Sequence, residues 1–194
     1  MQTLTAPQLA IATGATVGRA ELFLCGLLAA MSVYEIDGTP ERAAMFLANV
    51  GHESAGLQFV TEKWGPTPAQ AGYEGRRDLG NTQSGDGYRF RGRGLLQTTG
   101  RANFRALRDR LRARGIDCPD FEAAPDLVAQ PEWAALSAAD YIGMRRLNDK
   151  ADAGDFLGYC IGINGRNRST GLPNGWSDRT ARLERARRAL GIAA

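Results

Sequence analysis

The sequence is poor in the residues on which several enzyme classes depend. Histidine occurs once, at position 52, so it cannot supply the several protein ligands of a zinc amidase or peptidase. The three cysteines, Cys25, Cys118 and Cys160, are widely spaced and odd in number. They indicate neither a metal site nor a disulfide framework, which favours a chain kept reduced in a cytoplasm. No glycine-rich loop has the lysine and spacing that bind phosphate. We therefore expect no metal and no cofactor.

Long apolar runs are also missing. The longest, 22–33, is interrupted by a glycine and a serine, and it is shorter than the roughly 20 residues that span a bilayer. It predicts a buried helix and no stable membrane insertion. Cys25 lies in this run and is expected in the core, which argues against a nucleophile paired with His52. The start of the sequence lacks a basic leader and a small-residue cleavage site, so we expect synthesis without a secretory signal.

The charge is small overall, +3 at neutral pH, but arginine is concentrated in two helix-like segments. Two readings stay open: solvated helix faces, or attraction to an anionic polymer or envelope surface, with an anionic outer membrane proposed for the C-terminal set. Neither set shows the repeated aromatic residues of a base-stacking platform, so no nucleic acid is expected. The two sets are Arg101, Arg105, Arg108, Arg110, Arg112 and Arg114, and Arg179, Arg182, Arg185, Arg187 and Arg188.

The apolar periodicity predicts a mainly α, lysozyme-like α+β fold in one domain over residues 1–194. Residues 64–94 lose this periodicity and become rich in turn residues, while 88–91 alternates aromatic and basic residues like a short strand. We therefore expect a helical domain with a small β or irregular lobe that forms a substrate cleft. Helices are expected after Thr3 or Thr5, at 19–34, after Thr39, and at 101–114, 131–145, 152–162 and 176–190.

Glu53 lies on an apolar helical stripe. Val50 and Phe46 precede it by three and seven positions, and Gly56 is a plausible terminator of the same helix. Partial burial and the negative end of a helix dipole disfavour the ionised form of a carboxyl group. A general acid needs such a group near neutral pH. The alternative is an exposed glutamate at a frayed helix end.

A second carboxylate, Glu62, follows nine residues later. If the chain turns back, it faces Glu53 across a cleft, and a separation of about 6.5–9.5 Å would leave room for the water of an inverting glycosidase. The alternative is a surface ion pair with Lys63. Glu74 is a rival base with a similar alternative.

The segment 88–99, YRFRGRGLLQTT, is dense in glycine and polar residues. Gly92 and Gly94 allow a close approach of the backbone to a ligand. Gln97 and Thr99 share one face if the segment is extended, where they would hold a water or bind a sugar. Alternatively, Thr99 caps the helix expected at 101–114.

At GHESAG, GDGYRFRGRGLLQTTGRANF and INGRN the sequence resembles glycoside hydrolase family 19, the chitinase-like family that includes many phage endolysins. The resemblance spans roughly residues 40–190. It implies a lysozyme-like, largely helical fold and an inverting reaction in which Glu53 is the general acid. It also implies that Glu62 is the base, as in bacterial and phage members. The counterpart of the base in plant members would be Glu74, so the base stays open between these two residues.

The resemblance further implies residues that contact the polymer. Thr99 matches the residue that positions the attacking water, with Gln97 beside it. The expected substrate-binding residues are Gln97, Tyr88, Asn103, Asn164 and Arg179. The sequence departs from the family at Asn164-Gly165-Arg166, where a second glycine is usual, and in the short loop 65–80.

The resemblance implies an endolysin that hydrolyses the β-1,4 bonds of peptidoglycan, of the muramidase type, for lysis of a host cell. A chitinase is the main alternative, and a lytic transglycosylase or an inactive wall-binding module are others. The sequence has no chitin-binding module, secretion signal or disulfide framework, and these absences favour peptidoglycan. We expect a monomer without a separate wall-binding module. It would be made in the host cytoplasm and reach the periplasm and wall after a membrane-permeabilising partner acts.

Overall fold

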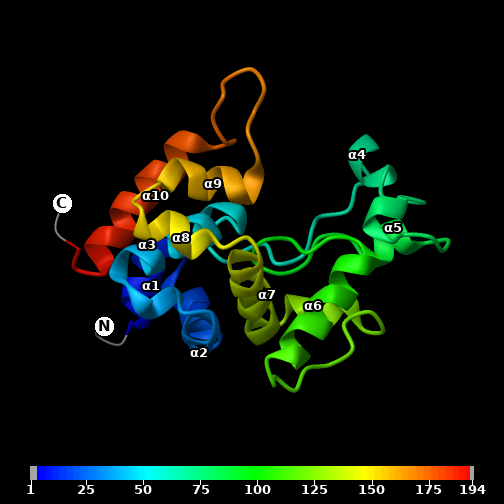
Figure 1. Ribbon diagram of the computed structural model, residues 1–194, viewed down its shortest axis with the longest axis horizontal. Helices are drawn as coiled ribbons and strands as arrows, with labels where there is room; N and C mark the ends of the chain where they lie inside the picture. The colour runs from blue at the N-terminus through cyan, green and yellow to red at the C-terminus, as the bar shows by residue number, and fades with distance from the viewer. Residues whose placement is uncertain (1–3, 193–194) are drawn as a thin grey trace.

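A computed structural model describes residues 4–192 (Figure 1). Its regular structure is helical, and the β structure in this range consists of two isolated bridges, Thr61–Arg93 and Arg93–Thr98. The prediction of a mainly α fold with a small irregular lobe is confirmed. The α-helices are α1 (Ala6–Thr13), α2 (Val17–Val33), α3 (Pro40–Glu53), α4 (Pro68–Ala71), α5 (Asp86–Arg89), α6 (Arg101–Ala113), α7 (Pro131–Met144), α8 (Leu147–Asp152), α9 (Phe156–Asn164) and α10 (Trp176–Ala189). Three 3₁₀ turns accompany them, η1 (Ile36–Gly38), η2 (Arg77–Leu79) and η3 (Pro125–Ala129).

Most of the expected helices are present, with small changes at their ends. Thr5 caps α1 by accepting a hydrogen bond from the backbone of Gln8, whereas Thr3 lies outside the described residues. The helix expected at 152–162 is wrong at its start, because Gly154 takes a left-handed φ of +67° and ends the preceding helix. Asp155 then caps α9, accepting from the Gly158 N–H at 2.7 Å.

The strand expected at 88–91 is wrong. Residues 86–89 form the short helix α5, preceded by Gly85 at a φ of +86°. The carboxylate of Asp86 accepts from the backbone N–H groups of Thr82 and Gln83 at 3.1 and 3.0 Å. These contacts bend the chain into a compact turn. Of the two aromatic residues in 88–91, Phe90 is buried and Tyr88 is exposed.

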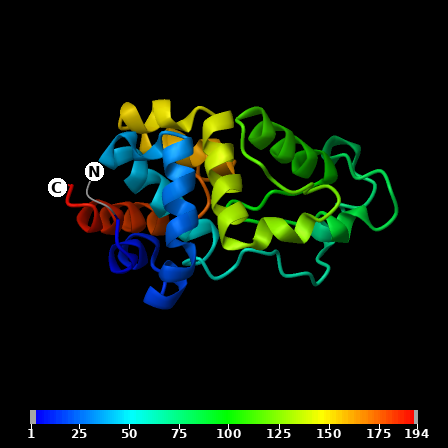
Figure 2. The same ribbon diagram turned by 90° about the horizontal axis from the view of Figure 1, so that it is seen from below.

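Helix α3 forms the centre of a large lobe made of α1–α3 and α8–α10 (Figures 1 and 2). Every residue of α3 from Ala43 to Gly51 is buried, so α3 is enclosed on all sides. Gly51 allows the close approach of α1, because a Cβ there would lie 2.3 Å from the carbonyl oxygen of Thr13. The enclosed helix gives its last residue, Glu53, a rigid support.

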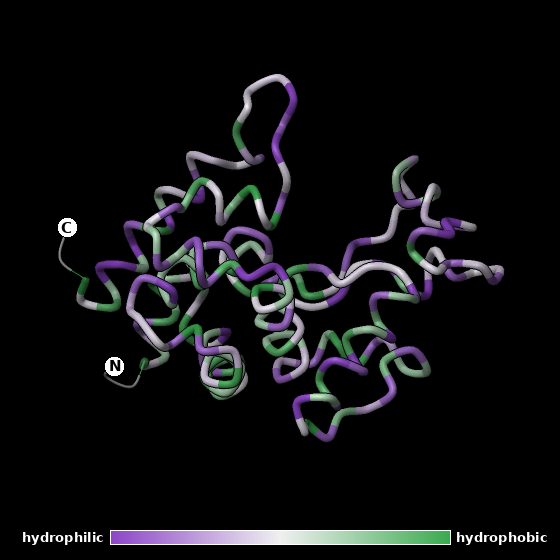
Figure 3. The backbone as a smooth tube through the Cα atoms, viewed as in Figure 1, coloured by the Kyte–Doolittle hydropathy of each residue, from purple (hydrophilic) through white to green (hydrophobic). Residues whose placement is uncertain are grey.

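The small lobe contains α4, α5, α6, η2 and η3, and α7 lies between the two lobes (Figure 1). Its core pairs Phe90 with Phe104, at 5.6 Å between ring centroids, and Phe121 with Trp133 at 5.5 Å. The segment around α5 is mainly hydrophilic, while hydrophobic segments gather where the helices of the large lobe meet (Figure 3). The small lobe thus has a limited apolar core and depends on polar contacts as well.

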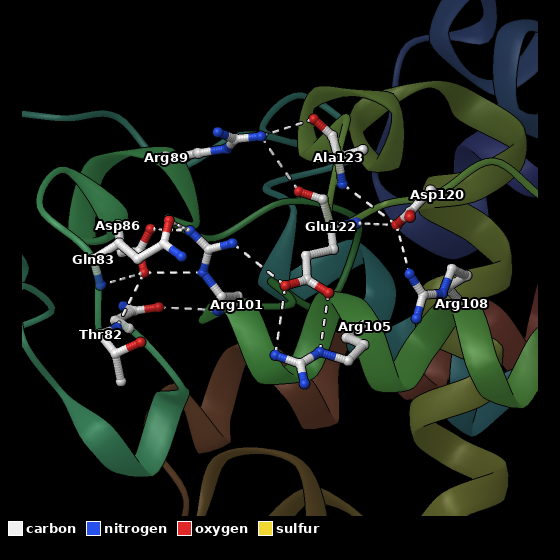
Figure 4. Close-up of polar contacts among 11 residues, drawn as sticks. Thr82, Gln83, Asp86, Arg89, Arg101, Arg105, Arg108, Asp120, Glu122 and Ala123 are labelled. Carbon is white, nitrogen blue, oxygen red and sulfur yellow. Dashed lines mark hydrogen bonds and ion pairs between the residues drawn. The ribbon is translucent and has the colours of Figure 1, made fainter.

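The arginines of α6 supply many of these polar contacts (Figure 4). Arg101 donates to both Asp86 and Glu122, and its side chain is only 12% exposed. Arg105 also binds Glu122, Arg108 binds Asp120, and Arg110 binds Asp140 of α7. The reading of a solvated helix face holds for Arg105, Arg112 and Arg114, which are exposed, while Arg101 and Arg108 are largely covered. Four of the six guanidinium groups are bound to carboxylates that fasten α6 to its neighbours.

The N-terminal apolar run is less buried than expected. Cys25 is exposed on α2, so its predicted place in the core is wrong, and Leu22 is 69% exposed beside it. Cys118 and Cys160 are buried, and all three cysteines are free thiols. Within residues 4–192 no single helix is long and apolar enough to cross a membrane; α1 and α2, which meet at a bend of 102°, pass that test only as a pair.

Candidate active site

Glu53 is the last residue of α3, and its side chain is 21% exposed. The helix ends here because Ala55, Gly56 and Leu57 all take left-handed φ angles of +50° to +70°. The hydroxyl of Ser54 fixes this turn by donating to the Val50 carbonyl at 2.6 Å and accepting from the Leu57 N–H at 2.8 Å. Glu53 is thus a half-buried carboxylate at a rigid helix end, as its position on the apolar stripe predicts.

Glu53 has a buried cationic partner that the sequence pattern does not reveal. The guanidinium group of Arg179, on α10, donates to Glu53 and is completely buried. It also donates to the Asn49 side chain at 2.6 Å and to the Asn174 carbonyl at 2.9 Å. Arg179 therefore fixes the orientation of the Glu53 carboxylate from the buried side. The expected contact between Arg179 and the polymer stays a prediction. Because Arg179 is buried, the contact that the structure shows is with Glu53.

We expect Arg179→Lys to weaken both stability and activity. An ammonium group cannot reproduce the planar fork that reaches Glu53, Asn49 and Asn174 together. The loss of such charge-assisted hydrogen bonds should cost about 2 kcal/mol, and thermal unfolding should show a Tm lower by about 4–8 °C. Arg188→Lys, an exposed change on the same helix, is the matched control. An unchanged Tm in Arg179→Lys would show that the fork does not hold Glu53.

His52, next to Glu53, joins the same two helices. Its Nδ1 lies 2.7 Å from Asp178 of α10, and Arg182 binds the same carboxylate at 2.6 Å. Burial acts to raise the pKa of Asp178, but the hydrogen bonds from Arg182 and His52 outweigh it and leave that pKa below its usual value. Gly175 packs against the imidazole so closely that a Cβ would lie 2.2 Å from the ring. His52 therefore acts as a tether between α3 and α10.

Glu62 lies half-buried on the segment between α3 and α4. One carboxylate oxygen accepts from Gln70 Nε2 at 3.0 Å and from the Tyr73 hydroxyl at 3.3 Å, and the other accepts from the Gly92 N–H at 3.0 Å. Lys63 turns away and lies over the Phe59 ring, 4.2 Å from its centroid. The alternative of a Glu62–Lys63 surface pair is therefore wrong, and Glu62 is a carboxylate held by three donors.

The neighbour Tyr73 remains a hydrogen-bond donor over a wide pH range. Burial, and then the charge and hydrogen bond of Glu62, raise the pKa of the Tyr73 hydroxyl above its usual value. A neutral phenol at this position keeps the Glu62 oxygen oriented at any pH near neutrality.

Glu74 has a different environment. One of its oxygens accepts from the Gly85 N–H at 2.7 Å and the other from the Gly87 N–H at 2.8 Å. These donors belong to the turn that starts α5, and a Cβ on Gly87 would collide with the Glu74 backbone at 2.8 Å. Glu74 therefore serves to fold the small lobe, which leaves Glu62 as the better candidate for a base.

Three of the expected polymer-binding residues come together in a pocket of about 240 Å³ between α6 and α7. The hydroxyl of Thr99 donates to the Gln97 carbonyl at 3.0 Å, and Asn103 donates to the Thr99 carbonyl at 2.6 Å. Gln97 takes a left-handed φ of +55°. The prediction that Thr99 caps α6 is wrong, because Gly100 is the capping position and no side chain caps it. The lining includes Gln97, Thr99, Asn103, Tyr141 and Arg145.

Tyr88 and Asn164 lie outside this pocket. Tyr88 is 53% exposed and contacts Trp64 edge-on at 5.3 Å, with Arg91 4.2 Å from its ring centroid. Asn164 ends α9, and its side-chain oxygen accepts from the Asn174 N–H at 3.3 Å. Since Asn174 also binds Arg179, Asn164 is connected to Glu53 through two intermediate residues.

Groups suited to metal binding or thiol chemistry can be compared with the carboxylates of the described residues. No group of three or more histidine, cysteine or acidic side chains within residues 4–192 is arranged to hold a metal. Burial raises the pKa of Cys160 to about 11, so this thiol is protonated near neutral pH and is a poor nucleophile. The arrangement is one of carboxylates, amides and hydroxyls, which is suited to acid–base chemistry on a sugar.

Comparison with known proteins gives related results. No protein-family model matches the chain. Over 57% of the chain it is 30% identical to a Haemophilus influenzae protein described as a glycosyl hydrolase family 19 domain-containing protein, of which the match covers 70%. Two solved structures share its fold. One is chitinase C from Streptomyces griseus, with a TM-score of 0.70, 23% identity and coverage of 98% of this chain and 78% of the other. The other is a bacterial family 19 chitinase, with a TM-score of 0.67, 25% identity and coverage of 98% and 96%.

Proposed function

This chain belongs to glycoside hydrolase family 19, and on that premise we propose that it is an inverting, muramidase-type endolysin that cuts the β-1,4 bonds of peptidoglycan. One observation carries the proposal. The two candidate carboxylates are fixed by different partners. Glu53 is bound by the cationic Arg179, and Glu62 is bound by neutral donors that include Gln70 and the Gly92 N–H. Two carboxylates that are held separately and by different partners can take different parts in one reaction.

In the proposed reaction Glu53 gives its proton to the oxygen of the glycosidic bond, and the bond to the departing sugar breaks. The carboxylate that remains is negatively charged, and the buried guanidinium of Arg179 stabilises it. Because Arg179 is fixed by Asn49 and Asn174, this stabilisation requires no rearrangement of the site.

Glu62 takes the proton of a water molecule that attacks the opposite face of the sugar ring. The three donors around Glu62 hold the carboxylate in one orientation before the substrate arrives. Thr99 and Gln97 position the water or the sugar, and Tyr88, Asn103 and Asn164 contact the polymer. The product then has the inverted anomeric configuration.

Peptidoglycan and chitin share a β-1,4-linked N-acetylhexosamine backbone, so the second candidate substrate is chitin. Two solved structures that resemble this chain are chitinases, which favours it. The basic character of this chain, with a net charge of +3, favours peptidoglycan, because its peptide stems carry carboxylates while chitin is neutral.

The setting that we propose is lysis of a host cell by a phage. The enzyme would be made in the host cytoplasm and would reach the wall once a membrane-permeabilising partner has acted. A contact between α10 and an anionic envelope would depend on Arg185 and Arg188. The other arginines of α10 are bound to Glu53, Asp178 and Glu41.

The test is digestion of purified murein beside glycol chitin, with mass analysis of the products. We expect faster release of reducing fragments from murein, with N-acetylmuramic acid at the new reducing ends. Faster hydrolysis of glycol chitin would favour the chitinase. Products ending in 1,6-anhydro sugars would instead identify a lytic transglycosylase.

A further inference from the structure

Arg145, at the end of α7, lines two adjoining pockets. One is the pocket that contains Gln97, Thr99 and Asn103. The other is a recess of about 490 Å³ along α8 and α9, whose lining includes Arg145, Leu147, Lys150, Leu157, Ile161 and Arg166. Tyr141 joins the two walls, because its hydroxyl donates to the Gly162 and Ile163 carbonyls of α9 at 3.3 Å. The recess and the candidate substrate pocket therefore have Arg145 as a shared wall residue.

The recess combines an apolar lining with cationic side chains. Leu147, Leu157 and Ile161 supply apolar surface. Lys150 is paired at 3.0 Å with Asp155, the one carboxylate of the described residues that line the recess. Among residues 4–192, Arg145 and Arg166 have no carboxylate partner; Arg145 lies over the Tyr141 ring at 5.3 Å, and Arg166 donates to the Gly171 carbonyl at 2.8 Å. The recess thus offers two uncompensated guanidinium groups above an apolar surface.

One wall of the recess is formed by helix α9, which is connected to Glu53 through hydrogen bonds. Its wall residues Leu157 and Ile161 belong to α9, which ends at Asn164. Asn164 connects through Asn174 and Arg179 to Glu53. A polymer bound in the pocket around Thr99 would contact Arg145, which also lines the recess.

We propose that this recess binds the peptide stem of the peptidoglycan strand being cut. The inference rests on the proposed function and adds a determinant of substrate choice. A stem peptide branches sideways from the glycan, carries short apolar side chains, and bears free carboxylates. The apolar wall takes its alanine methyl groups, while Arg145 and Arg166 bind its carboxylates. Chitin has no such branch and gains nothing from the recess.

The test compares two substrates that share one glycan. The first is murein strands that keep their peptides, and the second is the same strands after an amidase has removed the peptides. Arg166 lines the recess but not the pocket around Thr99. Arg166→Gln should lower kcat/KM about tenfold on the peptide-bearing strands and less than about twofold on the stripped strands. Arg168→Gln is the matched control, since Arg168 is exposed two residues away and lines neither pocket.

A direct binding measurement complements the kinetics. Titration of the wild type with a soluble stem tetrapeptide should shift the NMR signals of α8 and α9, and the Kd should rise about tenfold in Arg145→Gln and in Arg166→Gln. Thermal unfolding of each variant verifies that it is folded.

Three outcomes would overturn the inference. Equal losses on both substrates in Arg166→Gln would make Arg166 a contact of the glycan. Equal rates of the wild type on both strands, with no loss in either variant, would show that the recess has no role, while the proposed function would stand. Failure of the wild type to cut either strand would remove the proposed function as well.

Discussion

Replacing Glu53 with glutamine should lower kcat on purified murein by about a thousandfold. The amide has no proton to give to the glycosidic oxygen. It still presents an oxygen to the guanidinium of Arg179, which binds Glu53 in the native protein, so the folded structure should persist. Release of reducing ends, measured together with the Tm by circular dichroism, separates a chemical defect from unfolding.

The matched control for this change is Glu21→Gln. Glu21 is exposed on α2 and takes no part in the contacts described for the candidate site. It loses the same charge and should retain full activity. Wild-type activity in Glu53→Gln would transfer the role of proton donor to another residue and would overturn the mechanism.

The second large effect is expected at Glu62. Glu62→Gln should reduce kcat by about a hundredfold or more, because the amide cannot take a proton from water. Glu74→Gln is its internal comparison and should reduce activity only slightly. Glu74 accepts hydrogen bonds from two backbone N–H groups at the start of α5. Glu74→Gln should therefore lower the Tm of the protein and leave kcat nearly unchanged.

Azide distinguishes a base from a structural carboxylate. It needs no base to act as a nucleophile, so it should restore turnover in Glu62→Ala and give a glycosyl azide of inverted configuration. The ranking of the two glutamates would be reversed if Glu74→Gln were the inactive variant and azide rescued Glu74→Ala.

The sequence predicts much of the fold because helix signals are local. Thr39 followed by Pro40 predicts the start of α3, and the Thr39 side chain caps it. The periodicity of the apolar residues predicts α2, α6, α7 and α10 to within a few residues. The irregular lobe is harder, since α5 depends on contacts of Asp86 with the distant Arg101. The alternation in 88–91 therefore predicts a strand where the chain forms a helix.

The candidate site also has features that local patterns predict and features that depend on distant residues. The position of Glu53 on an apolar stripe indicates a half-buried carboxylate, and the motif around Gln97 and Thr99 indicates a binding surface. The partner of Glu53 depends on residues 126 positions apart, which no local pattern can specify. A usable signal is Asn49, which lies one turn before Glu53, so a buried amide on that face requires a partner.

The pairing of Glu53 with Arg179 also affects when the enzyme becomes competent during synthesis. α10 can close onto α3 only after residues 176–189 have left the ribosome. Contacts of such long sequence separation form late in folding. A nascent chain that ends before α10 therefore has Glu53 without its partner Arg179. On the proposed function, full activity requires that α10 has been synthesised and has packed against α3.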